Sequence, residues 1–182
     1  MTTDGPPLRD ALKSAASALL ADGPPFALAG SYALWVHGAP EPTHDVDLVV
    51  AERDVEHAAS TLGNAGFTIT RPPETWLFKA ELGPALVDVL HRVNGTAVEP
   101  DVIGEATTHD VLAVPMPVLS ATVVLVQKLK SLNEHHCDYA RLLPAARAVR
   151  EQVDWKHVAD ASGDNDFAAA FLFLIRRLGI TP

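Results

Sequence analysis

Two aspartates stand one residue apart in a segment that is otherwise apolar, because residues 45–50 read DVDLVV. On a strand, Asp45 and Asp47 would point the same way, with Cα atoms about 6.5 to 7 Å apart. Two ionised carboxylates this close repel each other and lose hydration unless a cation lies between them. Carboxylate oxygens suit Mg²⁺ or Mn²⁺. The pattern predicts a divalent metal site, although a strand end with two solvent-exposed aspartates would have the same sequence.

A Gly-Ser pair precedes the aspartates. Gly30 and Ser31 follow the apolar segment 26–29, and a short helix is expected from Ser31 to about residue 37. The free N–H groups at such a turn favour an anion, such as the phosphates of a nucleotide. Gly30 would let the backbone approach closely, and the Ser31 hydroxyl could donate a hydrogen bond. Ser31 could equally be a plain helix N-cap.

A third carboxylate interrupts another apolar run, because residues 86–90 read LVDVL around Asp88. If this strand neighbours the strand of Asp45, three acids converge on a space that can hold one or two metal ions. The alternative is a solvent-facing position or a bulge. The apolar neighbours on both sides of Asp88 favour the functional interpretation.

A lysine lies on the apolar side of a predicted helix. At 100° per residue, Lys128 falls inside the apolar stripe of the helix expected over residues 118–134, whereas Lys130 falls outside it. The stripe consists of Ala121, Leu125, Leu129 and Leu132. A lysine facing inward is costly unless its ammonium group meets an anion. The side chain could also extend along the edge of the stripe to water.

These residues carry a resemblance to a known family. Gly30-Ser31, Ala33 and Gly38, followed by THDVDL at residues 43–48, resemble the signature of nucleotidyltransferases related to DNA polymerase β. Within that superfamily, the chain looks most like the AbiEii and MenT type toxins, which are encoded beside an antitoxin. The resemblance implies transfer of an NMP group from an NTP, such as ATP, to an acceptor hydroxyl. It also implies the 3′ end of tRNA as the acceptor, blocked translation, and an antitoxin protein as a partner.

The resemblance also assigns roles to residues. Asp45, Asp47 and Asp88 would be the catalytic ligands of Mg²⁺ or Mn²⁺, while Gly30 and Ser31 would bind the nucleotide phosphates. Lys128 would contact the triphosphate.

The match to the family pattern is incomplete at Asp138 and in the loop before the two aspartates. Asp138 could be the acid that follows the lysine and orients the lysine or the substrate, or it could be a helix N-cap. Many relatives have an arginine in the loop before the two aspartates, but residues 39–44 read APEPTH. This departure puts the nucleotide identity and the phosphate geometry in doubt, but it does not touch the metal ligands.

Other residues that could carry chemistry have plainer explanations. Adjacent ligands such as His135, His136 and Cys137 rarely aim at one metal, so we expect no zinc site there. Arg71, Lys79 and Arg92 lie near the proposed acidic strands and could meet substrate phosphates, although solvated surface charges are the default.

The elements that must position these residues change character along the chain. Before residue 118, helical and strand patterns alternate; after it, the pattern is helical. We therefore predict an α/β (α+β) fold, with a polymerase β-like nucleotidyltransferase core over residues 1–117 and a C-terminal helical bundle over 118–182. The core would contain a mixed sheet flanked by helices. Helices are expected at 8–20, 31–37, 55–65, 118–134, 138–150, 154–161 and 165–178, and strands at 26–29, 45–50, 67–70, 75–82, 85–93 and 111–114.

Composition narrows the function further. The net charge of −9 argues against a wide groove for duplex DNA, and 48% hydrophobic residues indicate a cored protein. One cysteine, no secretory signal pattern and no apolar stretch long enough to cross a bilayer indicate a cytoplasmic protein without a membrane partner. Two alternatives remain: the same chemistry on an aminoglycoside-like molecule or a protein side chain, and a catalytically silent nucleotide-binding module.

Overall fold

A computed structural model describes residues 7–181. The chain divides into two compact units: a sheet unit formed by residues 1–32 and 42–119, and a helical unit formed by residues 33–41 and 120–182. Helix α2 (Gly30–Val36) runs from the first unit into the second. Across residues 7–181, none of the helices has the length and apolar character needed to pass through a membrane.

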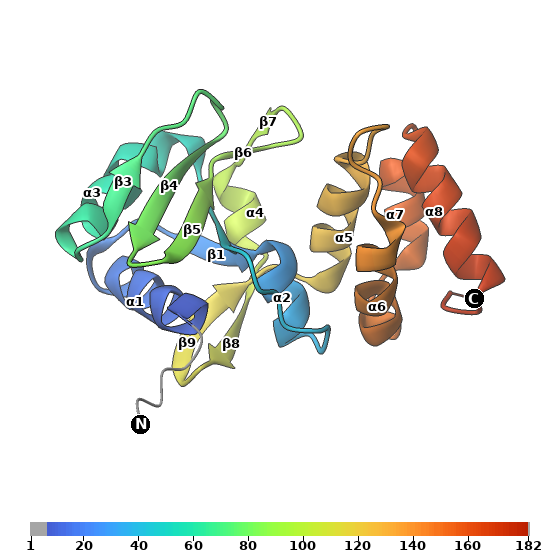
Figure 1. The fold of residues 1–182 in the computed structure, drawn as a ribbon, viewed down its shortest axis with the longest axis horizontal. Coiled ribbons are helices and arrows are strands. Elements are labelled where there is room, and N and C mark those ends of the chain that lie inside the picture. The colour runs from blue at the N-terminus through green and yellow to red at the C-terminus, as the bar shows by residue number, and fades with distance from the viewer. Residues whose placement is uncertain (1–6, 182) are drawn as a thin grey trace. The chain divides into compact units, whose positions relative to one another are not determined.

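The sheet unit is built on one mixed sheet of seven strands in the order β3-β4-β5-β2-β1-β9-β8 (Figure 1). Neighbouring strands are antiparallel except for β2 beside β5 and β1 beside β9, which are parallel. The strands are β1 (Phe26–Ala29), β2 (Val46–Val50), β3 (Thr68–Thr70), β4 (Leu77–Leu82), β5 (Ala85–Leu90), β8 (Thr107–Val111) and β9 (Val114–Val118). This mixed sheet with its flanking helices agrees with the predicted fold class.

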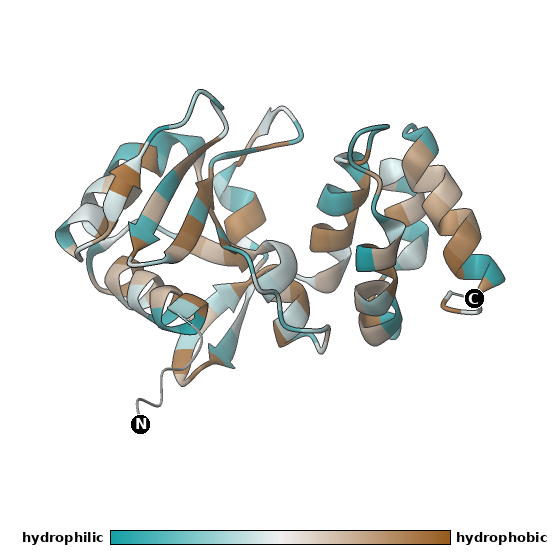
Figure 2. Cartoon of the chain, viewed as in Figure 1, coloured by the Kyte–Doolittle hydropathy of each residue, from teal (hydrophilic) through white to brown (hydrophobic). Residues whose placement is uncertain are grey.

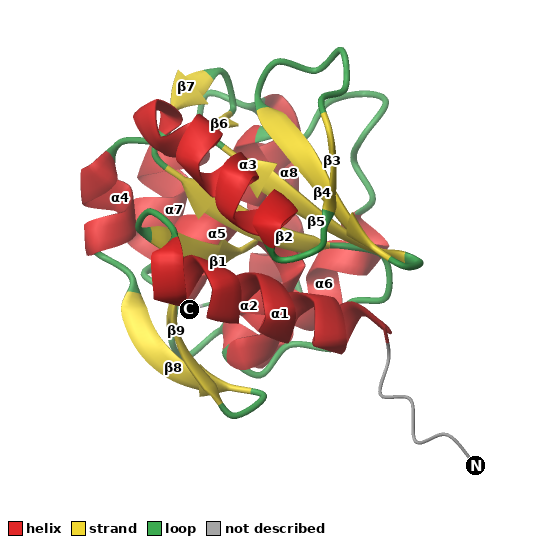
Figure 3. Ribbon diagram, turned by 90° about the vertical axis from the view of Figure 1, so that its left-hand side faces the viewer, coloured by secondary structure: helices red, strands yellow, loops and turns green. Residues whose placement is uncertain are grey.

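Helices α1 (Pro7–Asp22) and α3 (Val55–Asn64) lie over the same face of the sheet (Figure 3). Side chains alternate along a strand, so Val46, Leu48 and Val50 share one face of β2, and all three are fully buried. On β5, Val87 and Val89 are likewise fully buried. Asp47 and Asp88 therefore point to the opposite face. Strands β4 and β5 appear as mainly hydrophobic ribbons interrupted by hydrophilic residues (Figure 2).

Smaller elements complete the sheet unit. A 3-10 helix, η1 (Glu52–Asp54), follows β2, and helix α4 (Pro100–Gly104) precedes β8. A separate two-stranded sheet joins β6 (Arg92–Val93) and β7 (Thr96–Ala97). The sequence patterns predicted neither of the two short helices.

The predicted strand over residues 111–114 is wrong. Leu112 and Ala113 have φ angles of 53° and 65° and form the tight turn between β8 and β9. Two consecutive left-handed residues match the right-handed twist of a hairpin, but the pair is usually Asn-Gly or Asp-Gly. An apolar pair in this conformation carries no turn signal, so the sequence alone could not place it.

Several predicted boundaries also shift, and three of these shifts concern the candidate site. Strand β2 begins at Val46, so Asp45 lies just before it, and β5 ends at Leu90, where the predicted strand continued to residue 93. Helix α2 begins at Gly30, so Ser31 lies in its first turn and is not its N-cap.

The helical unit contains α5 (Ala121–Lys130), α6 (Tyr139–Val149), α7 (Trp155–Ser162) and α8 (Asp166–Arg177). The last three agree with the predicted helices to within a residue at each end, whereas α5 is shorter at both ends than the predicted helix over 118–134. Side chains cap all four: Ser120, Asp138, Asp154 and Asn165 each accept a backbone N–H of the first turn. Asn165 also donates to the carbonyl of Leu132 at 2.8 Å, which ties the start of α8 to the loop after α5.

Candidate functional site

The hydrogen-bond register of the sheet assembles a row of charged residues. Asp47 on β2 lies directly opposite Asp88 on the parallel strand β5. Asp88 in turn lies opposite Lys79 on the antiparallel strand β4. Residues directly opposite one another on neighbouring strands project from the same face, with Cβ atoms about 5 Å apart. Lys79, Asp88 and Asp47 therefore form one row across three adjacent strands.

Asp45 completes a carboxylate cluster with Asp47 and Asp88. One oxygen from each of the three side chains lies within 4.8 Å of the other two. Within residues 7–181, this is the one group of three or more His, Cys, Asp or Glu side chains arranged to hold a metal ion. The structure thus brings together the three residues that the sequence singled out as metal ligands, while their function as ligands stays a prediction.

Gly30 leaves the space that the Asp47 carboxylate fills. Its φ angle is +57°, in the left-handed region that favours glycine. A Cβ atom added to Gly30 would overlap the Asp47 carboxylate, because Cγ and Cβ of Asp47 would lie only 2.6 and 2.8 Å away. The glycine is therefore needed at the turn for its backbone conformation and for its lack of a side chain.

The Asp88 carboxylate is largely buried and is paired with a lysine. Its side chain is 12% exposed, and its Oδ1 accepts a hydrogen bond from Lys79 Nζ at 3.0 Å. Burial raises the pKa of Asp88 above its ordinary value, and the negative charge of Asp45 acts in the same direction. The hydrogen bond and positive charge of Lys79 oppose the rise in pKa. The proton affinity of Asp88 is thus set by competing neighbours, as is common at functional sites.

Lys79 is a candidate for which the sequence left two interpretations open, a contact with substrate phosphates and, by default, a solvated surface charge. Arg71 fits that default description, because it pairs with Glu56 at 2.8 Å between two well-exposed side chains. Lys79 does not, because it lies in the middle of β4 and its side chain is only 31% exposed. The alternation in LFKAEL (77–82) places Lys79 on the face of β4 opposite Phe78 and Ala80. Only the strand register, which sequence patterns do not specify, places it beside Asp88.

The other predicted site residues have these local surroundings. Ser31 is half-buried in the first turn of α2. Lys128 is half-buried on α5, whereas Lys130 is exposed, as the helical periodicity indicated. All four residues of the predicted apolar stripe are buried: Ala121, Leu125, Leu129 and Leu132.

Asp138 is the N-cap of α6, where its Oδ1 accepts from the backbone N–H of Arg141 at 3.2 Å. The capping alternative left open by the sequence is thus met, and a role in nucleotide binding stays a prediction. Next to it, His135, His136 and Cys137 are all exposed, and they form no metal-binding group in the part of the chain that the structure describes.

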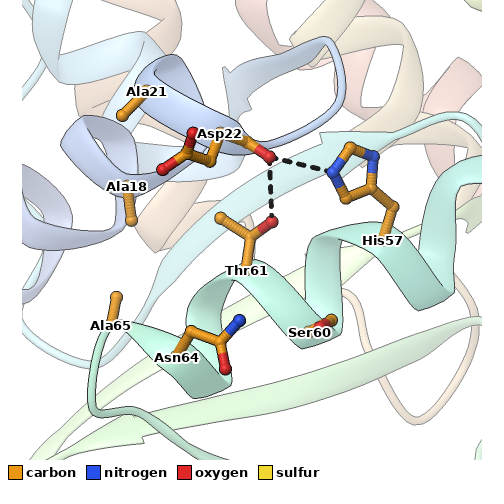
Figure 4. Close-up of a pocket in the computed structure, with 8 residues that line it drawn as sticks. All are labelled: Ala18, Ala21, Asp22, His57, Ser60, Thr61, Asn64 and Ala65. Atoms are coloured by element: carbon orange, nitrogen blue, oxygen red, sulfur yellow. Dashed lines mark hydrogen bonds between the residues drawn. The ribbon is translucent and has the colours of Figure 1, made fainter.

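A pocket of about 370 Å³ lies between the end of α1 and α3 and is separate from the carboxylate cluster (Figure 4). Three of its lining residues are linked by hydrogen bonds, because the Asp22 carbonyl accepts from His57 Nε2 at 2.9 Å and from Thr61 Oγ1 at 3.3 Å. Its other lining residues are Ala18, Ala21, Ser60, Asn64 and Ala65. None of the predicted site residues lines this pocket.

Comparison with known proteins supports the fold. No protein-family model and no curated protein matches the sequence. Among solved structures, the antibiotic-resistance factor ANT(2′′)-Ia in solution aligns with 94% of this chain and 96% of its own, with a TM-score of 0.61 and 12% identity. The structure of ANT(2′′)-Ia with adenylyl-2′′-tobramycin aligns with 90% of this chain and covers 95% of the ANT(2′′)-Ia chain, with a TM-score of 0.57 and 14% identity.

A third neighbour is an antigenic nucleotidyltransferase-like protein from Paracoccidioides brasiliensis. It aligns with 93% of this chain and 88% of its own, with a TM-score of 0.52 and 14% identity. At such low identity the alignments establish the architecture alone. The chain has a nucleotidyltransferase fold, and its three clustered aspartates lie at one face of the sheet, two on neighbouring strands and Asp45 just before β2.

Proposed function

We propose that the chain is a metal-dependent nucleotidyltransferase that moves an NMP group from an NTP to an acceptor hydroxyl. The observation that carries the proposal is the carboxylate cluster: three aspartate side chains whose oxygens lie within 4.8 Å of one another on one face of a sheet. The fold supports it, because the neighbours in structure are nucleotidyltransferases and nucleotidyltransferase-like proteins.

The donor set fits a divalent cation. Three carboxylates within reach of one ion are hard oxygen ligands, and the missing side chain of Gly30 leaves the Asp47 carboxylate its place in the cluster. Mg²⁺ or Mn²⁺ held by Asp45, Asp47 and Asp88 would neutralise the triphosphate and the charge that develops during transfer. The catalytic power would then come mainly from positioning and electrostatics.

The chain's own residues have distinct tasks in this reaction. The acceptor oxygen attacks the α-phosphorus, the bond from that phosphorus to the β-phosphate oxygen breaks, and pyrophosphate leaves. Asp88 would accept the proton of the attacking hydroxyl. Gly30 and Ser31 would bind the β- and γ-phosphates, and Lys128 would neutralise charge on the departing pyrophosphate. Asp138 would orient Lys128 or the substrate.

For the acceptor, we propose the 3′ end of tRNA. This assignment rests on the resemblance to AbiEii and MenT type toxins, which also implies blocked translation in the cytoplasm and an antitoxin partner.

A small cationic acceptor is the second candidate, and two observations favour it. The net charge of −9 suits a cation. The fold also matches ANT(2′′)-Ia, which has been solved with adenylyl-2′′-tobramycin, over nearly the full length of both chains. An aminoglycoside-like molecule would accept the same NMP group on one of its hydroxyls.

The test is a transfer assay with each α-³²P-labelled NTP in turn, Mg²⁺ or Mn²⁺, and a choice of acceptors. The acceptors are total tRNA, the same tRNA with its 3′ end oxidised by periodate, a panel of aminoglycosides, and a protein extract. Label in intact but not in oxidised tRNA supports the toxin function. Label in an aminoglycoside or in protein selects a different acceptor. No transfer with any acceptor, while NTP still binds, would identify a silent nucleotide-binding module.

The assay has a matched pair of variants. Asp47→Asn removes one charge from the cluster, and Asp10→Asn removes one charge from the exposed face of α1. We expect Asp47→Asn to lower the transfer rate by roughly a thousandfold, because a lost ligand removes stabilisation of developing charge. Asp10→Asn should stay close to the wild-type rate. Equal activity of the two variants would contradict the proposed site.

A further inference from the structure

Lys79 occupies one side of the carboxylate cluster. Its Nζ lies 3.0 Å from Asp88 Oδ1, and Asp88 is the middle member of the row that Lys79 and Asp47 complete. Lys79 belongs to no element of the signature that suggested the site. Its place in the row is fixed by the six-residue antiparallel pairing of β4 with β5.

The charges explain why a lysine is needed there. Three carboxylates within 4.8 Å of one another repel, and the Asp88 side chain has little water around it. In the metal-free protein, the ammonium group of Lys79 offsets part of that repulsion. It does so through the same carboxylate that is proposed as a metal ligand.

The Lys79 side chain can also release the contact. It is 31% exposed, and its four-carbon stem is flexible, so the ammonium can move into water at low cost. A bound divalent cation and a lysine ammonium repel each other when both lie beside one carboxylate. The ammonium and the metal therefore compete for Asp88.

We propose that Lys79 is a positioning residue that competes with the metal for Asp88. Its ammonium group neutralises Asp88 in the metal-free protein and is displaced when a divalent cation binds. Lys79 therefore sets the metal affinity of the cluster. The inference rests on the proposed function, because it takes the three aspartates as the metal site. The inference adds to the proposed function a residue that lowers the metal affinity of the cluster and stabilises its metal-free form.

The experiment measures Mn²⁺ binding to the metal-free protein of 182 residues by calorimetry, with free Mn²⁺ counted by electron paramagnetic resonance. Lys79→Gln removes the charge but keeps a hydrogen-bond donor, and Lys79→Arg keeps the charge. Lys13→Gln, on the exposed side of α1, removes one positive charge elsewhere and is the matched control. We expect Lys79→Gln to bind Mn²⁺ roughly tenfold more tightly than wild type, because a nearby positive charge is gone. Lys79→Arg and Lys13→Gln should stay within about threefold of wild type.

A purely structural role predicts the opposite result. If Lys79 only holds β4 against β5, its loss leaves Mn²⁺ affinity unchanged or weaker, and either outcome overturns the inference. Lys79→Met serves as a second charge-free variant if Lys79→Gln fails to fold. In the Asp88→Asn background, the gain from Lys79→Gln should become smaller, because the ammonium and the metal no longer compete for a charged carboxylate.

The outcomes separate this inference from the proposed function. If wild type binds Mn²⁺ and transfers NMP, but Lys79→Gln binds no more tightly, the inference fails and the function stands. If Lys79→Gln binds more tightly but no acceptor is ever labelled, Lys79 keeps its assigned role and the transferase function fails. If folded wild type and variants all fail to bind Mn²⁺, both are wrong.

Discussion

The sheet unit and the helical unit use charge in different ways. The sheet unit contains fifteen Asp and Glu against six Lys and Arg, whereas the helical unit contains eight of each. The whole net charge of −9 therefore belongs to the sheet unit. Three of its acids are drawn into one cluster, at an electrostatic cost. In the helical unit, by contrast, Asp138 and Asp154 cap helices, and Lys156 pairs with Asp160 on the surface.

The comparison separates charged residues that stabilise the fold from charged residues that do not. Capping and surface pairing are ordinary uses of charge: a cap contributes about 1 kcal/mol, and an exposed ion pair contributes little. A carboxylate cluster on a sheet face has no such use, because it destabilises the fold unless a cation joins it. The sheet unit therefore supports a chemical function by itself, while the candidates in the helical unit depend more on the resemblance. The variants below test this contrast in order of expected effect.

The largest effect is expected from Gly30→Ala in the sheet unit. The new Cβ would displace the Asp47 carboxylate, so we expect roughly a thousandfold loss of transfer together with weaker Mn²⁺ binding. Gly83→Ala is the matched control: its φ of +58° imposes the same backbone strain, of about 1 kcal/mol, but nothing lies within 4 Å of its Cβ. If both variants lose activity equally, backbone strain and not the overlap with Asp47 is responsible.

Lys128→Met tests the strongest candidate of the helical unit. We expect about a hundredfold lower kcat/KM, because the methionine keeps the packing of the half-buried stem but cannot neutralise a phosphate. Lys130→Met on the exposed side of the same helix should change kcat/KM less than about twofold. Steady-state kinetics over a range of NTP concentrations provides the measurement. Similar values for the two variants would remove Lys128 from the site.

Asp138→Ala separates capping from substrate contact. Asp154→Ala is its counterpart, because Asp154 caps α7 through the N–H of His157 at 2.9 Å. Both variants should lower the free energy of unfolding by about 1 kcal/mol. We expect only Asp138→Ala to lower transfer as well, by roughly tenfold. A transfer rate that matches that of Asp154→Ala would leave Asp138 as a cap alone.

The smallest effect concerns the pH dependence of stability. The folded-state pKa of Asp88 lies above its ordinary value of 3.8, chiefly because the carboxyl is buried. The folded protein thus holds this proton more tightly than the unfolded chain does. The stabilisation is complete below pH 3.8 and is lost as the pH rises through the folded-state pKa.

The difference in Tm between the metal-free wild type and Asp88→Asn isolates this contribution. It should become less favourable to wild type as the pH rises through that range. Saturating Mn²⁺ should reverse the trend, because the metal favours the ionised carboxylate. A difference in Tm that does not vary with pH would mean that burial does not perturb Asp88.

Sequence patterns predicted correctly those features that depend on strong local signals. The helices of the second unit follow from apolar periodicity, and Asp138 was a visible N-cap candidate for one of them. The metal-site candidates were visible because aspartates in an apolar strand are costly. The sequence could not show that the three aspartates lie together. That depends on β2 and β5 being neighbours in the sheet, although residues 51–84 separate them in the chain.

The features that the sequence did not predict depend on contacts between distant residues or on residue types that carry no structural signal. The Lys79–Asp88 contact follows from a strand register, and an isolated lysine in a strand gives no sign of its partner. The turn at Leu112 and Ala113 adopts a conformation that its residue types do not favour, so the pairing of β8 with β9 must hold it in place. The same limit applies to Gly30: its sequence position indicated a turn, but the space it leaves for Asp47 is a property of the folded sheet.

The parallel pairing of β2 with β5 has a practical consequence for anyone who prepares this protein. If these two strands paired one residue out of step, Asp88 would turn to the helix-covered side, away from Asp47, yet the content of helix and strand would hardly change. Circular dichroism would not detect such misfolded molecules. If the cluster is the proposed metal site, bound Mn²⁺ per chain would detect them and would be the better measure of how much of a refolded sample is native.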